Sequence, residues 1–315
     1  MQPMDERAEQ RGRSSREGLA ERIASAIRED GVVEPIPGLH LTRASEPSGT
    51  IHGVSQPSLC VIAQGAKEVY LGDSRYRYDA QRYLLTTIEL PVTARIVQAS
   101  RERPYLAFRL ELDEALVGSV MVEAGLPAPR SQGDAKALVV SALDSGLLDA
   151  TLRLVELSGS PVEARVLVPL VKREIVFRLL MGEQGNRLRH LPMLGYSHSI
   201  AKAIGLLRKD FDQPLRIESI ARELGMSSSS FHHHFKAITD MSPLQFQKQL
   251  RLQEARRMML GENLDAASAG FRVGYGDASH FSRDYKKRFG ISPARDAERL
   301  RANMGTIPAA STYSR

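Results

Sequence analysis

The spacing of apolar and polar positions changes along the chain, and the change marks segments of different secondary structure. Apolar residues recur at helical spacing in residues 19–29, which predicts an amphipathic helix. From about residue 50 to 112, short runs rich in β-branched and aromatic residues alternate with turn residues, which predicts a sandwich or small barrel. The predicted strands are 50–55, 58–64, 67–72, 75–79, 82–87, 92–98 and 105–112.

Helical periodicity returns after the β-rich region. Residues 113–130 predict a helix followed by a loop, and residues 134–158 and 161–181 predict two longer helices. The apolar face of 161–181 is so wide that it needs cover from the β-rich part or from another subunit. Residues 182–195, rich in Gly, Arg and Asn, are predicted to be a linker to a wholly helical region.

The strongest pattern in the chain is an internal repeat with an offset of 50 residues in this helical region. In each copy a glycine precedes an aromatic pair spaced i,i+4, a lysine follows the pair, and a Ser-Pro dipeptide comes next. The matched positions are Phe231, Phe235 and Lys236 with Phe281, Tyr285 and Lys286; Gly225 with Gly274, at an offset of 49; and Ser242-Pro243 with Ser292-Pro293. Each copy therefore predicts two helices joined by a glycine turn, a helix-turn-helix unit.

The second helix of each predicted unit presents a polar face opposite its aromatic pair. The aromatic pair is expected to anchor the helix to a core, so the opposite face points to solvent. Hydroxyl, imidazole and cationic groups on such a face suit base edges and phosphates in a DNA major groove, although a plain solvated hairpin is the alternative. The predicted base-reading residues are Ser228, Ser229, His232, His233, Ala278, Ser279, Ser282 and Arg283, and the predicted phosphate contacts are Lys236, Lys286 and Lys287.

The distribution of charge favours the DNA interpretation. Residues 1–195 hold 24 Lys+Arg and 25 Asp+Glu, a net charge of −1, whereas residues 196–315 hold 19 and 12, a net charge of +7. A basic domain beside a neutral one favours a polyanionic partner. A single cysteine, Cys60, leaves no intramolecular disulfide and fits a reducing compartment.

Further composition features place the protein in the cytoplasm without a membrane partner. No run approaches the roughly 20 apolar residues of a membrane span. The polar, Arg- and Glu-rich residues 1–18 lack the apolar core of a secretory signal. Residues 1–18 and 301–315 are predicted to be disordered tails.

Residues 196–300 resemble the DNA-binding domain of the AraC/XylS family of bacterial transcription regulators. The segments that carry the resemblance are Ile220-Ala221, 231–236, 242–246, Arg251-Leu252, Ala255-Arg256, 271–275 and 279–293. The resemblance implies a long helix at about 244–260 between the units and two recognition helices in successive major grooves, which lie about 34 Å apart on one DNA face. Three departures from the family pattern are Gly270 for alanine, Asp240 for glycine and Gly276-Asp277 for Glu-Ser. We expect Gly270 to loosen its helix by up to ~1 kcal/mol.

The β-rich part resembles, over roughly residues 38–130, the cupin-like N-terminal domain of one AraC subgroup. The matching runs are 56–65, 83–85, 89–92 and 102–110. The expected fold is thus a two-domain α+β protein: a cupin-like β-barrel with flanking helices over 19–181 for effector sensing or dimerisation, and an all-α domain with two helix-turn-helix units over 196–300. The resemblance implies a transcription regulator whose partners are double-stranded DNA, a small-molecule effector, a second copy in a homodimer and, for an activator, RNA polymerase.

The sequence speaks against metal or enzyme chemistry. His232, His233 and His234 are consecutive, and adjacent helical residues point about 100° apart, so they cannot share one ion. The absence of histidine between Gly53 and Arg189 argues against a metal-dependent cupin enzyme. We therefore predict no enzyme activity, metal or cofactor. The alternatives are a metal-free cupin-type enzyme or binder, and an interaction module that uses the apolar helices at 134–181.

A barrel of this kind offers an apolar mouth for a small ligand. The candidate effector-pocket residues are Cys60, Ile62, Tyr83, Leu85 and Phe108. Alternation along residues 58–64 puts Cys60 and Ile62 on one face of a strand, but does not decide which face is interior. Cys60 would act as a redox or electrophile sensor only with a lowered thiol pKa.

Overall fold

The computed structural model describes residues 3–127, 136–191, 196–262 and 264–304. The chain forms two compact units that divide between His198 and Ser199. Elements of the first unit are α1 (Pro3–Ala26), β1 (Gly31–Ile36), β2 (Leu39–Ala44), β3 (Ile51–Ser55), β4 (Ser58–Gln64), β5 (Ala66–Leu71), β6 (Ser74–Asp79), β7 (Arg82–Thr86), β8 (Leu90–Gln98), β9 (Tyr105–Glu111), α2 (Glu114–Glu123), β10 (Leu138–Ala142), α3 (Ser145–Leu157), α4 (Pro161–Met181) and α5 (Gly185–Leu188).

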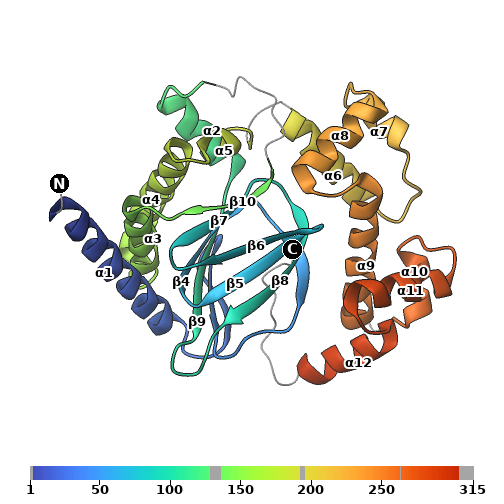
Figure 1. Ribbon diagram of the computed structural model, residues 1–315, viewed down its shortest axis with the longest axis horizontal. Coiled ribbons are helices and arrows are strands. Elements are labelled where there is room, and N and C mark those ends of the chain that lie inside the picture. Colours follow the sequence, from blue (N-terminus) through green and yellow to red (C-terminus); the bar gives the residue numbers. More distant parts are fainter. Residues whose placement is uncertain (1–2, 128–135, 192–195, 263, 305–315) are drawn as a thin grey trace. The chain divides into compact units, whose positions relative to one another are not determined.

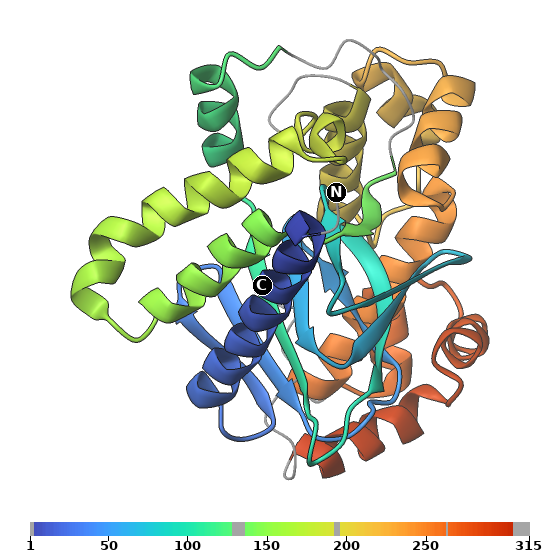
Figure 2. The ribbon, with the colours of Figure 1, turned by 60° about the vertical axis from the view of Figure 1, so that its left-hand side comes forward.

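The strands of the first unit form two antiparallel sheets with helices over one of them. The six-stranded sheet has the order β1-β2-β9-β4-β7-β10, and the four-stranded sheet has the order β3-β8-β5-β6. Helices α1, α3 and α4 lie across the outer face of the six-stranded sheet (Figure 2). Their apolar faces and one face of that sheet make a shared core, which includes Leu19, Ile23, Leu154 and Ile175, all 0% exposed.

The register of the six-stranded sheet assigns each side chain to one of its two faces. In β4, Val61 pairs with Tyr83 and Phe108, whereas Cys60 pairs with Leu84 and Arg109. Leu59, Val61 and Ala63 belong to the core under the helices. Because successive strand residues point to opposite faces, Cys60 and Ile62 face the four-stranded sheet.

Besides the unpredicted strands β1 and β2, three segments of the first unit differ from the sequence prediction. The first helix begins at Pro3, so most of the predicted tail at 1–18 is helical, as the Ala, Glu, Arg and Gln content of that segment favours. Strand β10 replaces the start of the helix predicted over 134–158 because Leu138–Ala142 pair with β7. Residues 182–191 of the predicted linker pack instead, since Leu188 and Leu191 are buried in the core. The other linker residues, 192–195, lie outside the described residues.

The second unit is helical, as predicted. Its elements are α6 (Tyr196–Lys209), α7 (Ile217–Glu223), α8 (Ser228–Thr239), α9 (Pro243–Gly261), α10 (Ala266–Arg272), α11 (Ala278–Phe289) and α12 (Pro293–Met304). The long helix α9 runs between the group α6–α8 and the group α10–α12 (Figure 1). Most of the predicted tail at 301–315 lies outside the described residues. Among the described helices, none combines the length and the apolar content that a membrane crossing needs.

Candidate nucleic-acid interface

The two repeated helices, α8 and α11, are each anchored by the aromatic pair that the repeat predicted. Phe231, Phe235, Phe281 and Tyr285 are all 0% exposed. In α8 the two phenylalanine rings lie 5.5 Å apart edge to face, and the Phe281 and Tyr285 rings of α11 have the same separation. Edge-to-face contacts of this kind add to the stability that burial of each ring provides. One face of each helix is thereby fixed to its core.

The opposite faces of α8 and α11 carry the predicted reading residues. Ser229, His232, His233 and Lys236 are exposed on α8, and Ser279, Arg283, Lys286 and Lys287 are exposed on α11. Ser228, Ala278 and Ser282 are half-buried beside them. In the part of the chain that the structure describes, the three lysines form no ion pair. Each face is therefore open, polar and positively charged. The third histidine, His234, lies half-buried at the edge of the core.

Caps and turns define where α8 and α11 begin and end. The Ser227 side chain accepts a hydrogen bond from the Ser230 N–H, and the Asp277 side chain accepts one from the His280 N–H. The predicted turn glycines, Gly225 and Gly274, have φ values of +68° and +86°. These left-handed conformations favour glycine because it has no Cβ.

Two of the three departures from the family pattern have a structural explanation. Asp240 takes the left-handed conformation (φ 56°) that ends α8, and a short polar side chain tolerates it better than most residues. At Gly270 an added Cβ would lie 2.8 Å from Cγ of the buried Phe281 ring. The glycine of α10 therefore makes room for the anchoring ring of α11, which offsets its lower helix propensity.

A buried carboxylate, which the sequence analysis did not single out, joins three helices of the second half of the unit. Asp296 of α12 is 0% exposed and accepts hydrogen bonds from Arg256 Nε of α9 (2.8 Å) and from the Tyr285 hydroxyl of α11 (2.9 Å). Burial, together with the Asp296 carboxylate, raises the pKa of the Tyr285 hydroxyl, so that hydroxyl stays protonated and donates. A second link joins α9 to α11, where Lys248 Nζ lies 2.6 Å from Asp284 Oδ1.

The five candidate pocket residues of the first unit do not line a single cavity. Cys60 and Ile62 face the space between the sheets, whereas Tyr83 and Leu85 belong to the core under the helices. Phe108 also belongs to that core but lines the same cavity as Cys60. The prediction placed them together because alternation gives the two faces of a strand but not which strands are in register. Of the five, Cys60 and Phe108 line a small cavity between the sheets.

The space beside Cys60 is small and contains two cationic side chains. Its cavity of about 20 Å³ is lined by Cys60, Lys67, Tyr78 and Arg109, among others. Burial raises the pKa of the Cys60 thiol, although Arg109 and Lys67 act in the opposite direction. A thiol that stays protonated is a poor nucleophile, so its environment does not favour a sensing role for Cys60.

Comparison with known families agrees with both halves of this architecture. Residues 35–187 match the family model of the AraC-type transcriptional regulator N-terminus, and residues 220–299 match a helix-turn-helix domain. The chain belongs to the AraC/XylS family of transcription regulators.

Individual relatives support the same class. The chain is 28% identical over 135 residues to the HTH-type transcriptional regulator ArgR of Pseudomonas aeruginosa, a match that covers 42% of this chain and 40% of ArgR. It is 25% identical over 175 residues to the regulator CdhR of the same organism, which covers 55% of this chain and 51% of CdhR. The chain thus spans about half the length of the curated relatives it matches. These relatives are regulators rather than enzymes.

Solved structures share the fold over most of the chain. ToxT from Vibrio cholerae O395 aligns with a TM-score of 0.53 at 12% identity and covers 84% of this chain and 99% of ToxT. A ToxT structure from strain SCE256, bound to an unsaturated fatty acid, aligns with a TM-score of 0.52 at 12% identity and covers 90% and 100%. The predicted α+β fold class is confirmed: an N-terminal β domain with flanking helices, whose strands form two sheets, is followed by an all-α domain with two helix-turn-helix units.

Proposed function

We propose that this regulator reads DNA with α8 and α11, placed in successive major grooves on one face of a duplex. The observation that carries the proposal is that both helices pair a buried aromatic face with an exposed polar and basic face. The base-reading residues are Ser228, Ser229, His232, His233, Ala278, Ser279, Ser282 and Arg283. Lys236, Lys286 and Lys287 contact phosphates, because a flexible ammonium suits a backbone charge.

Arg283 is expected to make the strongest single base contact. Its guanidinium is exposed on α11 and can donate two hydrogen bonds to one guanine. The substitution Arg283→Ala should weaken binding to the specific site by about 1–3 kcal/mol and relax sequence preference at one base pair. Lys286→Ala is the matched control: it should weaken binding to all sequences alike and lower the salt slope by about one unit. An unchanged sequence preference in Arg283→Ala would remove this residue from the reading set.

Fluorescence anisotropy of the full chain tests the DNA proposal. The probes are a duplex from immediately upstream of the gene for this chain and a scrambled duplex of equal composition, each over a salt series. We expect binding to the upstream duplex to be tens-fold tighter or more, with a steep salt dependence. Absence of binding to either duplex, even at low salt, would contradict the proposal.

The first unit is proposed to bind a small carboxylate effector between its two sheets. The presence of Lys67 and Arg109 at the cavity beside Cys60 supports an anionic ligand, since a guanidinium binds carboxylates with charge-assisted hydrogen bonds. ToxT has been solved with an unsaturated fatty acid and with a substituted but-3-enoic acid. A cavity of about 20 Å³ holds roughly one water, so the sheets must part to admit such a ligand. An unsaturated fatty acid should change the DNA affinity of the full chain, whereas its methyl ester should not; equal effects would refute the anionic class.

Two protein partners are also part of the proposal. RhaS of Salmonella is named as a transcriptional activator, and an activator role for this chain would involve contact with RNA polymerase. Such a regulator acts where the chromosome lies, which supports a cytoplasmic location for the chain. The second partner is another copy of the chain, for which α4 offers a surface.

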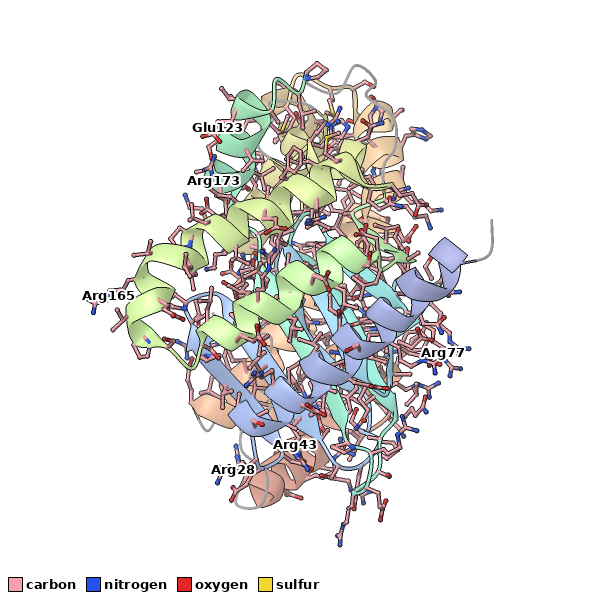
Figure 3. The ribbon with its side chains drawn as sticks, turned by 90° about the vertical axis from the view of Figure 1, so that its left-hand side faces the viewer. Arg28, Arg43, Arg77, Glu123, Arg165 and Arg173 are labelled. Carbon is pink, nitrogen blue, oxygen red and sulfur yellow. The ribbon has the colours of Figure 1, made fainter. Side chains whose placement is uncertain are left out.

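Helix α4 presents an apolar stripe to solvent on the side opposite its core. The stripe consists of Val162, Val166, Leu170, Phe177 and Met181, which are 44–72% exposed and recur at helical spacing. Figure 3 shows Arg165 projecting outward from α4 and Arg173 turned toward Glu123 of α2, with which it forms an ion pair. Two copies that join these stripes about a twofold axis bury the same surface on both sides.

The substitution Leu170→Glu is expected to weaken the homodimer about tenfold or more, because it puts a charge at the centre of the joined stripes on both copies. Arg165→Glu is the matched control, since residue 165 lies about 100° around the helix from Val166. Light scattering over a concentration series measures both. A wild-type chain that stays monomeric at the highest concentration would contradict the dimer.

A further inference from the structure

Arg251 of α9 connects the two helix-turn-helix units through backbone carbonyl groups. Its Nε donates to Phe211 O (2.6 Å), and its Nη2 donates to Asp212 O (3.2 Å) and Gln213 O (2.8 Å), all in the loop between α6 and α7. Its Nη1 donates to Gly274 O (3.0 Å), in the turn between α10 and α11. One side chain therefore donates hydrogen bonds to the loop that enters the first helix-turn-helix unit and to the turn of the second helix-turn-helix unit.

The environment of Arg251 differs from that of an ordinary surface ion pair. All four acceptors are main-chain oxygens, whose positions are set by the backbone rather than by a flexible side chain. Burial lowers the pKa of the Arg251 guanidinium, but arginine remains charged at neutral pH. Hydrogen bonds from a charged donor in a low-dielectric setting are among the stronger ones. One turn earlier on α9, the buried Gln247 also donates to Gln213 O (2.9 Å).

The two helix-turn-helix units also contact each other directly beside Arg251. A Cβ added to Gly274 would lie 2.0 Å from Asp212 O. The turn between α10 and α11 therefore packs backbone to backbone on the loop between α6 and α7. The equivalent glycine of the first helix-turn-helix unit, Gly225, has a similar positive φ but nothing within 4 Å of such a Cβ. Both glycines adopt the left-handed turn conformation, but of the two only Gly274 is also needed for the close contact between backbones.

We propose that Arg251 is a positioning residue that sets the spacing and rotation between α8 and α11, with Gly274 providing the close contact it needs. This inference rests on the proposed reading of DNA by both helices. Two linked binding elements gain affinity from each other only while their geometry lets both engage at once. Because successive major-groove segments lie one helical turn apart, a fixed junction makes binding depend on the spacing of the two half-sites.

The test measures how binding depends on that spacing. The full chain is first used to select a two-part site from a random duplex library. Insertion of two base pairs between the halves rotates them by about 70°. The wild-type chain should lose about tenfold or more in affinity on this insertion. Arg251→Ala should bind the unaltered site more weakly and bind both spacings within about threefold of each other. Arg251→Lys, which keeps a cationic donor, should recover part of the spacing dependence.

Two matched controls separate positioning from general damage. Arg257 lies on the same helix and, among the described residues, its ion pairs are with Glu254 and Glu262, so Arg257→Ala should keep the wild-type spacing dependence. Gly274→Ala should flatten that spacing dependence as Arg251→Ala does, whereas Gly225→Ala should not. If Arg251→Ala does not fold, the comparison of these two glycine variants tests the positioning role instead. A library that yields no two-part site would refute the proposed DNA reading itself. A selected site on which Arg251→Ala and Gly274→Ala keep the full wild-type spacing dependence would overturn the positioning role.

Discussion

The substitution Asp296→Ala is expected to lower the free energy of unfolding of the helical unit by about 3–5 kcal/mol. The reason is that it leaves a charged partner without its counter-ion. Arg256 Nε lies 2.8 Å from Asp296 and its side chain is only 14% exposed, while the Tyr285 hydroxyl donates to the same carboxylate. Removal of the carboxylate leaves both donors in the interior without an acceptor. A buried charge without a partner lowers the free energy of unfolding by more than the intact pair raises it.

Denaturant unfolding of the full chain, followed by a probe of the helical unit, measures this loss. The matched control is Glu298→Ala on the same helix, since Glu298 is exposed and should change stability by no more than about 0.5 kcal/mol. Asp296→Asn should fall between the two, because the amide keeps the shape and one acceptor but not the charge. Equal stability of Asp296→Ala and Glu298→Ala would show that the buried cluster contributes nothing.

The substitution Phe281→Ala is expected to lower stability by a similar amount, about 3–5 kcal/mol, and to release α11 from its core. The Phe281 ring is 0% exposed, contacts Tyr275 at 5.3 Å and Tyr285 at 5.5 Å, and occupies the space that Gly270 leaves open. Loss of the ring leaves a cavity that the surrounding helices fill only in part. DNA affinity should fall with it, because the reading face of α11 is oriented by that anchor.

The neighbouring Phe271 provides the control for this experiment. It lies on α10 and is 56% exposed, so Phe271→Ala removes a ring of the same size at little cost to the fold. Thermal unfolding and anisotropy on the selected site together distinguish the two variants. If Phe271→Ala lowered stability and DNA affinity as much as Phe281→Ala, the assignment of the buried anchor face of α11 would be wrong.

Local signals made the helical half predictable. Gly225, Gly274 and the i,i+4 aromatic pairs each specify a turn or a buried face from residues close together in sequence. The same reasoning placed most strands of the first unit, but it missed β1 and β2, whose run is interrupted by Pro35, Pro37 and Gly38, and took β10 for the start of a helix. A short apolar run fits either a strand or a helix, and only its pairing partner decides.

The contacts that the sequence did not reveal join residues far apart in the chain. Asp296 meets Arg256 across 40 positions, and Arg251 meets Phe211 across the same interval. Nothing in the spacing of these residues indicates the pairing. The division of the pocket candidates between two faces of one sheet likewise depended on register, which alternation along a single strand does not contain.

The repeat within the helical unit gives any DNA it binds a direction. The two helix-turn-helix units are successive copies in one chain, and their proposed reading faces differ: His233 of α8 occupies the position that Arg283 holds in α11. The two halves of a bound site therefore differ in sequence and are not mirror images, unlike the palindrome that a twofold dimer of single units selects. Inverting such a site relative to a promoter turns the bound protein end for end. A single bound copy can in this way distinguish upstream from downstream.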